Sequence, residues 1–250
     1  MKDPDPNAPT PRSPAGRFMT THWSVVLAAK SAASPKRTEA LSTLCATYWF
    51  PLYAFLRRNG YDTAQAEDFA QAFFAQLLDK DYLRQVEPEK GKFRTFLLTA
   101  LKHFVSKQRK YDRALKRGGG KAILSLDVED AESRYSLEPV DRLTPEMLFE
   151  RSWAMTVLRR AMDRLQGEAA TARKKRLYEE LSAYLTAQRT SVPYADIAEE
   201  LGMTEGAVKV AIHRMRSRYR EILRDEIAQT VADEQQIDDE IRDLFSALGS

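Results

Sequence analysis

Apolar residues recur at the spacing of a helix along most of this chain, and no block of the sequence is rich in strand patterns. In the first half, the spacing predicts helices over residues 38–59, 62–78 and 93–116. In the second half it predicts helices over 147–165 and 177–185, followed by a helical pair and an amphipathic tail. The chain is therefore expected to be all-α.

Breaks in this pattern divide the chain into parts. Three consecutive glycines at 118–120 follow the helix over 93–116, and an acidic stretch without strong periodicity comes next. The sequence therefore predicts two small helical domains joined by a flexible acidic linker. The predicted bounds are 1–20 for a disordered proline-rich arm, 21–117 for the first domain, 118–145 for the linker, 146–224 for the second domain and 225–250 for an acidic amphipathic tail.

Residues 194–213 have the pattern of a helix-turn-helix. Apolar positions such as Ile197 and Val208 lie at intervals that let two short helices cross and bury one seam. Gly202 occupies the sharp turn, where a left-handed backbone costs least for glycine. Thr204 can cap the second helix, which is strongly basic. This combination predicts that the ligand is duplex DNA.

The formal net charge of +3 conceals strong segregation of charge along the chain. Residues 90–121 hold eleven Lys or Arg and one acid, which gives +10, and residues 205–224 have a net charge of +4. Residues 122–150 and 225–243 are acidic, at −6 and −7. Two separate basic blocks indicate two contacts with one polyanion.

Several classes of protein are disfavoured. The single cysteine, Cys45, excludes a disulfide framework and fits a reducing cytoplasm, where we expect the protein to act. No apolar run reaches the length of a membrane span, so no membrane partner is expected. The three histidines are scattered, and no metal, phosphate-loop or nucleophile motif is present. We therefore expect no metal, no cofactor and no enzymatic activity.

Three motifs stand in a fixed order ahead of the helix-turn-helix. They read YWFPLYAFLRRNG at 48–60, QAEDFAQAFF at 65–74 and KFRTFLL at 92–98. They resemble regions 2.1, 2.2 and 2.3 of a bacterial RNA polymerase sigma factor of the extracytoplasmic-function type, in the sigma-70 family. The helix-turn-helix resembles region 4.2 of the same family. The resemblance covers roughly residues 21–224, and the LKRGGG linker and acidic tail are similar to a branch common in planctomycetes.

This resemblance implies a function in transcription initiation. The protein would bind core RNA polymerase through its β′ clamp helices and its β subunit, recognise −35 and −10 promoter elements, and promote promoter melting. An anti-sigma factor or another regulator is a further partner that the family implies. The residues implied for the polymerase contact are Glu67, Asp68, Gln71 and Phe74. Those for the −10 element are Lys90, Lys92, Arg94, Lys102, Lys107, Arg109 and Lys110. Those for the −35 element are Thr204, Glu205, Lys209, His213, Arg214, Arg216 and Arg218.

Some positions depart from the family pattern. Gln65 stands where the family usually has Asp, Phe96 replaces the usual Trp, and Lys102-His103-Phe104 replaces a frequent Arg-Asn pair. A second interpretation therefore stays open, namely a stand-alone helix-turn-helix regulator with an N-terminal dimerisation or sensor domain. The cluster of Glu67, Asp68 and Gln71 favours the sigma factor, because a regulator would not need it.

The acidic tail also has two interpretations. Its apolar positions, from Ile237 to Leu248, predict a helix that docks on the second domain and completes its core. Alternatively, the docked helix uses its acidic face to shield a basic DNA-binding surface until a partner displaces it. Deletion of residues 233–250 would separate these interpretations, because only masking predicts a gain in DNA affinity.

Overall fold

The structure is a computed structural model that describes residues 35–77, 92–114, 128–137, 143–186, 193–231 and 233–249. Every regular element within these ranges is helical, which confirms the predicted all-α class. The α-helices are α2 (Pro35–Arg58), α3 (Thr63–Leu77), α5 (Phe93–Ala114), α6 (Val128–Leu137), α7 (Pro145–Gly167), α8 (Ala172–Leu181), α9 (Ala183–Thr186), α10 (Tyr194–Leu201), α11 (Glu205–Ala228) and α12 (Ile237–Gly249), and a 3-10 turn, η3 (Glu234–Gln236), precedes α12.

A tight turn joins α2 to α3. Gly60 has φ of +87°, a left-handed conformation that favours glycine. Beyond it, the Gln65 amide donates to Asp62 Oδ1 at 2.8 Å, and the Asp62 amide donates to Gln65 Oε1 at 3.2 Å. These reciprocal bonds form a capping box, because each side chain satisfies a backbone amide that the first helical turn leaves free. Local sequence signals thus set the start of α3.

The long helix α7 forms a core that the two halves of the chain share. Phe149 and Trp153 are fully buried, and α7 packs against α2 as well as against α11 and α12. Further along α7, Arg160 and Arg164 donate to Glu226 of α11 at 2.9 and 2.7 Å. Residues of both predicted domains therefore belong to one hydrophobic cluster, which differs from the expected separation. The reason is that α7 buries consecutive residues, 152–154, and so buries more than one face.

Part of the predicted linker is a docked helix, α6. Ala131 is buried, and Arg57 of α2 forms a paired bond with Glu132, at 2.8 Å to Oε1 and 3.0 Å to Oε2. Tyr53 also donates to Glu132, and Arg134 stacks over the Phe50 ring at 3.7 Å. The linker is therefore not flexible throughout, because residues 128–137 pack on α2. Residues 118–127 and 138–142 of the predicted linker lie outside the described residues.

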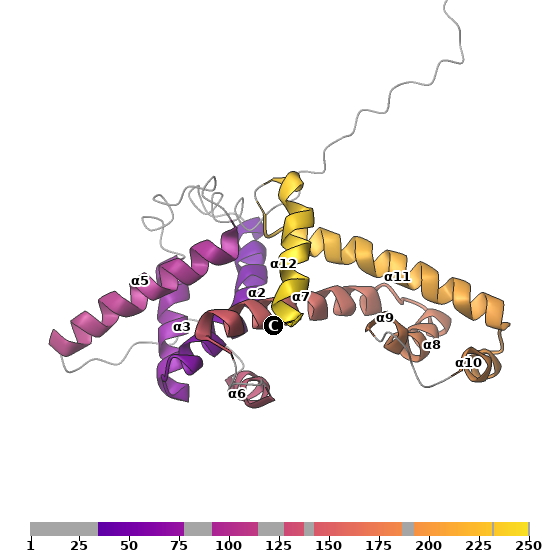
Figure 1. Ribbon diagram of the computed structural model, residues 1–250, viewed down its shortest axis with the longest axis horizontal. Coiled ribbons are helices and arrows are strands. Elements are labelled where there is room, and N and C mark those ends of the chain that lie inside the picture. Colours follow the sequence, from indigo (N-terminus) through magenta and orange to yellow (C-terminus); the bar gives the residue numbers. More distant parts are fainter. Residues whose placement is uncertain are drawn as a thin grey trace, which may run out of the picture.

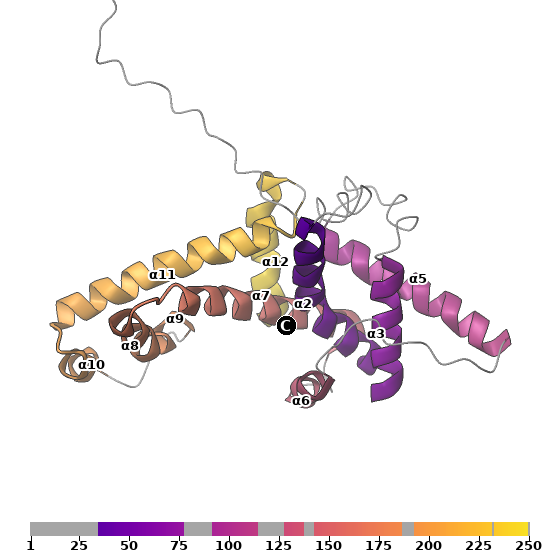
Figure 2. The same ribbon diagram turned by 180° about the vertical axis from the view of Figure 1, so that it is seen from behind.

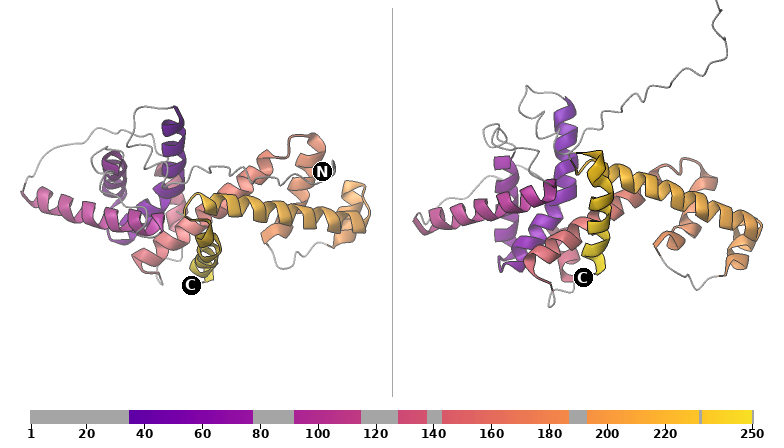
Figure 3. Two further views of the ribbon diagram at one scale, coloured as in Figure 1. Left: turned by 90° about the horizontal axis from the view of Figure 1, so that it is seen from above. Right: turned by 45° about the horizontal axis from the view of Figure 1, so that its top comes forward.

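Most of the predicted tail forms α12, which lies between the two arms of the molecule in Figures 1 and 2 and projects to one side in the view from above (Figure 3). Its Ile237 and Leu244 are buried, and it packs against α7 and α11. This packing confirms the expectation that the tail completes a core. Masking of a DNA-binding surface stays a prediction.

The two basic elements point to opposite ends of the molecule. Figure 1 shows the far end of α5 at one end, while α8, α10 and the start of α11 lie at the other. The shared core at α7 and α12 lies between them.

Candidate nucleic-acid interface

The turn of the helix-turn-helix has the predicted geometry. Gly202 caps α10 with φ of +62° and ψ of 39°, and the Met203 amide donates to the Ala198 carbonyl at 2.8 Å. Thr204 then caps α11, since its Oγ1 accepts a bond from the Ala207 amide at 3.2 Å. These two caps fix the angle at which α11 leaves the turn.

A small separate core supports this geometry. Tyr184 of α9 and Ile197 and Ala198 of α10 pack with Val208 and Ile212 of α11, and all are buried. The predicted seam between the two helices is therefore confirmed. Its burial on one side of α11 leaves the opposite side of that helix for a ligand.

Five of the residues predicted to contact the −35 element are exposed at the start of α11. Lys209 Nζ lies 3.6 Å from Glu205 Oε2 and 5.6 Å from the centre of the Tyr194 ring. The Tyr194 ring faces this cation, a contact that sequence reasoning missed, because residues 194 and 209 become neighbours only once the two helices cross. The exposed residues are Thr204, Glu205, Lys209, His213 and Arg214.

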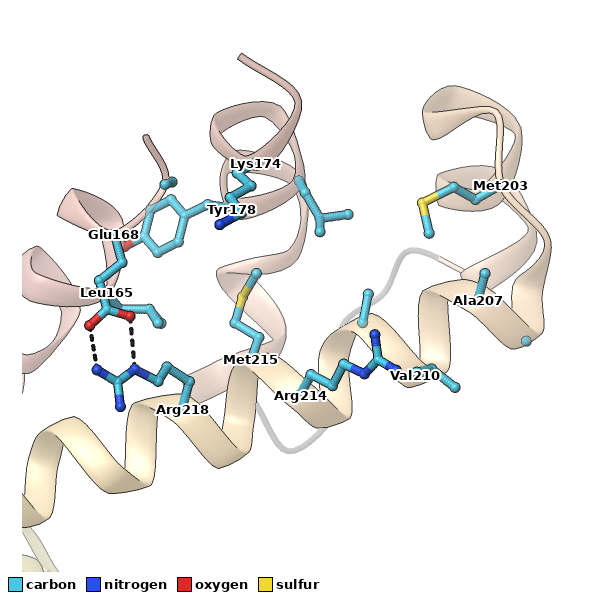
Figure 4. Close-up of a pocket in the computed structure, with 14 residues that line it drawn as sticks. Leu165, Glu168, Lys174, Tyr178, Met203, Ala207, Val210, Arg214, Met215 and Arg218 are labelled. Atoms are coloured by element: carbon cyan, nitrogen blue, oxygen red, sulfur yellow. Dashed lines mark hydrogen bonds and ion pairs between the residues drawn. The ribbon is translucent and has the colours of Figure 1, made fainter. Parts of the chain in front are cut away.

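Arg216 and Arg218 are instead bonded within the protein. Arg216 donates to the Tyr184 carbonyl from Nη2 at 2.7 Å and from Nε at 3.1 Å. Arg218 donates paired bonds to Glu168, at 2.6 and 2.8 Å (Figure 4). It donates a further bond to Glu221 at 2.8 Å. The carboxylates of Glu168 and then Glu221, which accept these bonds, raise the pKa of Arg218. Arg216 thus ties α11 to α9, and Arg218 ties α11 to Glu168, so both guanidinium groups have structural partners, and their DNA contacts stay predictions.

An apolar groove runs along one flank of α11 (Figure 4). Tyr178 of α8, Met203 of the turn, and Val210 and Met215 of α11 contribute to its lining. Val210 was missed by sequence reasoning. The spacing of apolar residues could have revealed it. Val210 follows the buried Val208 by two residues, so the two side chains cannot lie on the same face of the helix. The groove is lined by Leu165, Glu168, Ala169, Lys174, Leu177, Tyr178, Met203, Gly206, Ala207, Val210, Ala211, Arg214, Met215 and Arg218.

The basic helix α5 offers fewer accessible cations than the sequence predicts. Lys102 and Lys107 are exposed. Lys102 Nζ lies 2.6 Å from Glu146 of α7 and 5.7 Å from the centre of the Phe55 ring. Three more residues were predicted to contact the −10 element. The side chains of Arg109 and Lys110, and the whole of Lys90, lie outside the described residues.

Arg94, a predicted DNA contact, is buried. Its guanidinium donates to Glu150 and Glu240, and to Asp243 Oδ2 at 3.0 Å. The guanidinium carbon lies 4.4 Å from the centre of the Trp153 ring. Burial opposes the charge, but Glu150 and Glu240 outweigh it and raise the pKa of Arg94. Burial also raises the pKa of Glu150. Arg94 lowers it, but the nearby Glu240 and Asp243 carboxylates add to the increase, so the net shift of this pKa is upward.

The neighbouring Lys92 joins the same network. Its Nζ lies 3.0 Å from Glu240 Oε2 and also bonds Asp243. Arg94 therefore holds α5 to α7 and α12 and cannot reach DNA in this arrangement, which corrects the prediction for that residue. The charge count could not reveal this, because the carboxylates that bind Arg94 lie far along the chain.

The candidate polymerase contact lies on α3. Asp68 is exposed, and Gln71 Nε2 donates to Glu67 Oε1 at 2.9 Å. Phe74 is fully buried, so its expected place in this contact is wrong and it is a core residue. Phe74 lies on the inner face of α3, which leaves Glu67, Asp68 and Gln71 as the polar surface.

Two further properties concern the part of the chain that the structure describes. No group of three or more His, Cys, Asp or Glu side chains is arranged to hold a metal ion there. Among the helices of those residues, each is too short or too polar to cross a lipid bilayer.

The comparison with known families concerns the helix-turn-helix. Residues 183–218 match the family model described as sigma-70, region 4. The match begins with α9 and ends within α11, so it includes the turn and the exposed basic face. Searches of curated proteins and of solved structures gave no significant match to this chain. The chain therefore carries a segment that matches region 4 of the sigma-70 family, which supports a role in transcription initiation.

Proposed function

We propose that the chain is an extracytoplasmic-function sigma factor with three working surfaces. The start of α11 reads the −35 element as duplex DNA, α5 contacts the −10 element and assists melting, and α3 docks on the β′ clamp helices of polymerase. The proposal rests on the exposed cations Lys209 and Arg214, with His213 between them, inside the segment that matches region 4. Cations near the start of a recognition helix can read base edges in the major groove.

The shape of the molecule supports the use of two DNA surfaces. The exposed lysines of α5, Lys102 and Lys107, lie on a helix that extends away from the helix-turn-helix. Each surface alone would bind DNA weakly, and simultaneous contact with one promoter raises the effective concentration of the second site. The reaction class is binding and strand opening, and we propose no enzymatic step.

Co-purification with core polymerase tests the proposed function. We expect the full-length chain to retain the polymerase subunits from a cell lysate, and Asp68→Lys to lose them. Asp68 is exposed on α3, so reversal of its charge costs little folding stability. The reversal should weaken binding to polymerase more than it weakens folding, because like charges would then repel across the proposed interface.

The matched control is Asp163→Lys, which reverses an exposed charge on α7 instead. It should bind polymerase as the unsubstituted chain does. Retention by Asp68→Lys at the unsubstituted level would remove α3 from the interface. No retention by the unsubstituted chain, together with specific DNA binding on its own, would favour the stand-alone regulator.

The melting step has its own test. Replacement of Lys102, Lys107 and Arg109 by glutamine removes positive charge that would hold melted −10 DNA. We expect slower strand opening, read by permanganate reactivity of unpaired thymines, with unchanged binding to core polymerase. Normal opening in this triple variant would exclude this surface of α5 from melting.

A further inference from the structure

Val210 is a large apolar side chain that lies exposed on the recognition helix. It is 50% exposed, and it is the one exposed large hydrophobic residue of α11, all of which the structure describes. Val208 and Ile212, two residues to either side, are buried in the seam against α10. Because residues two apart lie on nearly opposite sides of a helix, Val210 points away from that seam.

The neighbours of Val210 distinguish it from an incidental surface residue. Lys209, His213 and Arg214 are all exposed and surround it on the same part of α11. One turn earlier is Gly206, where an added Cβ would meet only Thr204 Oγ1, at 4.0 Å. The helix backbone is therefore uncovered beside Val210, so a base edge can approach between the polar side chains.

We propose that Val210 contacts the C5 methyl group of a thymine and makes that base pair a determinant of promoter specificity. This proposal rests on the proposed function, in which the start of α11 enters the major groove of the −35 element. The major-groove edges of the base pairs present hydrogen-bond donors and acceptors, and the thymine methyl is their apolar group. Valine neither donates nor accepts, so beside any other base it would displace water from polar atoms without replacing the lost bonds.

The apolar groove offers a different explanation that the test must separate. Val210 lies at the rim of this groove, near Arg214 and beyond Met215 on α11 (Figure 4). A polymerase segment seated in the groove would cover Val210 without any role in reading DNA. The thymine contact depends on a single methyl group of the DNA, whereas the groove contact depends on polymerase alone.

The experiment uses the full-length chain bound to core polymerase. Duplexes are first selected from a randomised library, and each thymine of the enriched −35 segment is then replaced singly by deoxyuridine. This replacement removes only the C5 methyl group. With the unsubstituted chain, we expect one replacement to weaken binding about fourfold, the effect of exposing one buried methyl group.

Three variants identify the side chain responsible. Val210→Ala should bind the thymine and deoxyuridine duplexes equally, while Val210→Ile should retain the difference. Lys209→Ala should weaken binding to both duplexes and leave their ratio at about fourfold, because its loss removes a polar contact elsewhere in the groove of the DNA. Circular dichroism checks that each variant is folded, which we expect since both positions are exposed.

Several results would overturn the proposal. One is that no single thymine replacement changes the affinity of the unsubstituted chain. Another is that Val210→Ala keeps the fourfold ratio, because a different side chain would then contact the methyl group. A third is that Val210→Ala no longer binds core polymerase, which would assign Val210 to the groove. A library that yields no enriched duplex would contradict the proposed function itself and this contact with it.

Discussion

At the scale of single residues, the helix-turn-helix depends on the backbone of Gly202. Its φ of +62° lies in the left-handed region, which a side chain with a Cβ disfavours by about 1–2 kcal/mol. No atom lies within 4 Å of a Cβ built at this position, so the cost of a substitution comes from the backbone conformation alone. The glycine is therefore required by local geometry and not by packing.

This feature predicts opposite effects for two glycine substitutions. Gly202→Ala should lower the free energy of unfolding by about 1 kcal/mol, because alanine resists the left-handed conformation. Gly206→Ala should raise it by up to about 1 kcal/mol, because Gly206 lies inside α11 and alanine favours a helix. Denaturant unfolding of both variants measures the difference. Equal effects of the two substitutions would show that Gly202 has no special conformational role.

At the scale of secondary-structure elements, α6 is held to α2 by an ion pair that depends on pH. The bond from Arg57 lowers the pKa of Glu132 from its ordinary value of 4.5. The same bond raises the pKa of Arg57, so both shifts indicate a favourable pair. Because the carboxylate is the bonded form, α6 is docked most firmly where Glu132 is ionised.

The sign of the pH dependence follows from this shift. A carboxyl whose pKa is lower in the folded state contributes stability above its unfolded pKa of about 4.5, and loses it as the pH falls through the folded value. We expect Glu132→Gln to be less stable than the unsubstituted chain at pH 6, and the two to converge as the pH falls through the lowered pKa of Glu132 in the folded state. Unfolding curves across this range test the expectation. A stability difference that is constant with pH would exclude the ion pair as its cause.

At the scale of the whole molecule, the buried network around Arg94 joins α5, α7 and α12. Glu240 is fully buried beside Arg94 and belongs to α12, while Glu150 belongs to α7. Removal of Arg94 would leave these carboxylates with less positive charge in a poorly solvated site, and an uncompensated buried charge is strongly destabilising. The two halves of the chain are therefore connected by this ionic network in addition to the shared hydrophobic core.

We expect Arg94→Leu to lower the free energy of unfolding by about 3 kcal/mol. Lys102→Leu is the control, because its partner Glu146 is exposed and such surface pairs contribute about 0–1 kcal/mol. Chemical denaturation of the full chain compares the two. If Arg94→Leu were as mild as the control and weakened DNA binding instead, Arg94 would belong to the DNA surface after all.

What the sequence could predict follows from how local each signal is. The turn at Gly202 and the cap at Thr204 involve residues within a few positions of each other, and the sequence predicts both. The burial of Arg94 depends on Glu150 and on carboxylates of α12, which are remote in sequence, so a count of charges placed it among the DNA contacts. Phe74 was assigned to polymerase from the resemblance, although its helical register already placed it among buried residues.

The larger organisation was harder to predict for the same reason. The helix α7 reads as one apolar stripe, whereas in the structure consecutive residues 152–154 are buried by partners from both halves. The helix α6 has weak periodicity, and its docking depends on Glu132 meeting Arg57, a pair separated by 75 residues. Contacts of this kind become visible only when the helices are arranged in space.

The packing of α7 against both halves also has a consequence for the geometry of promoters. One base pair added between two DNA elements moves them about 3.4 Å apart and turns one relative to the other by about 35°. As long as α7 stays packed on both sides, the protein cannot follow that turn as a loose tether would. If the protein reads two promoter elements as we propose, helical phase is part of what it reads, and two well-matched elements on the wrong faces of the double helix form a poor promoter.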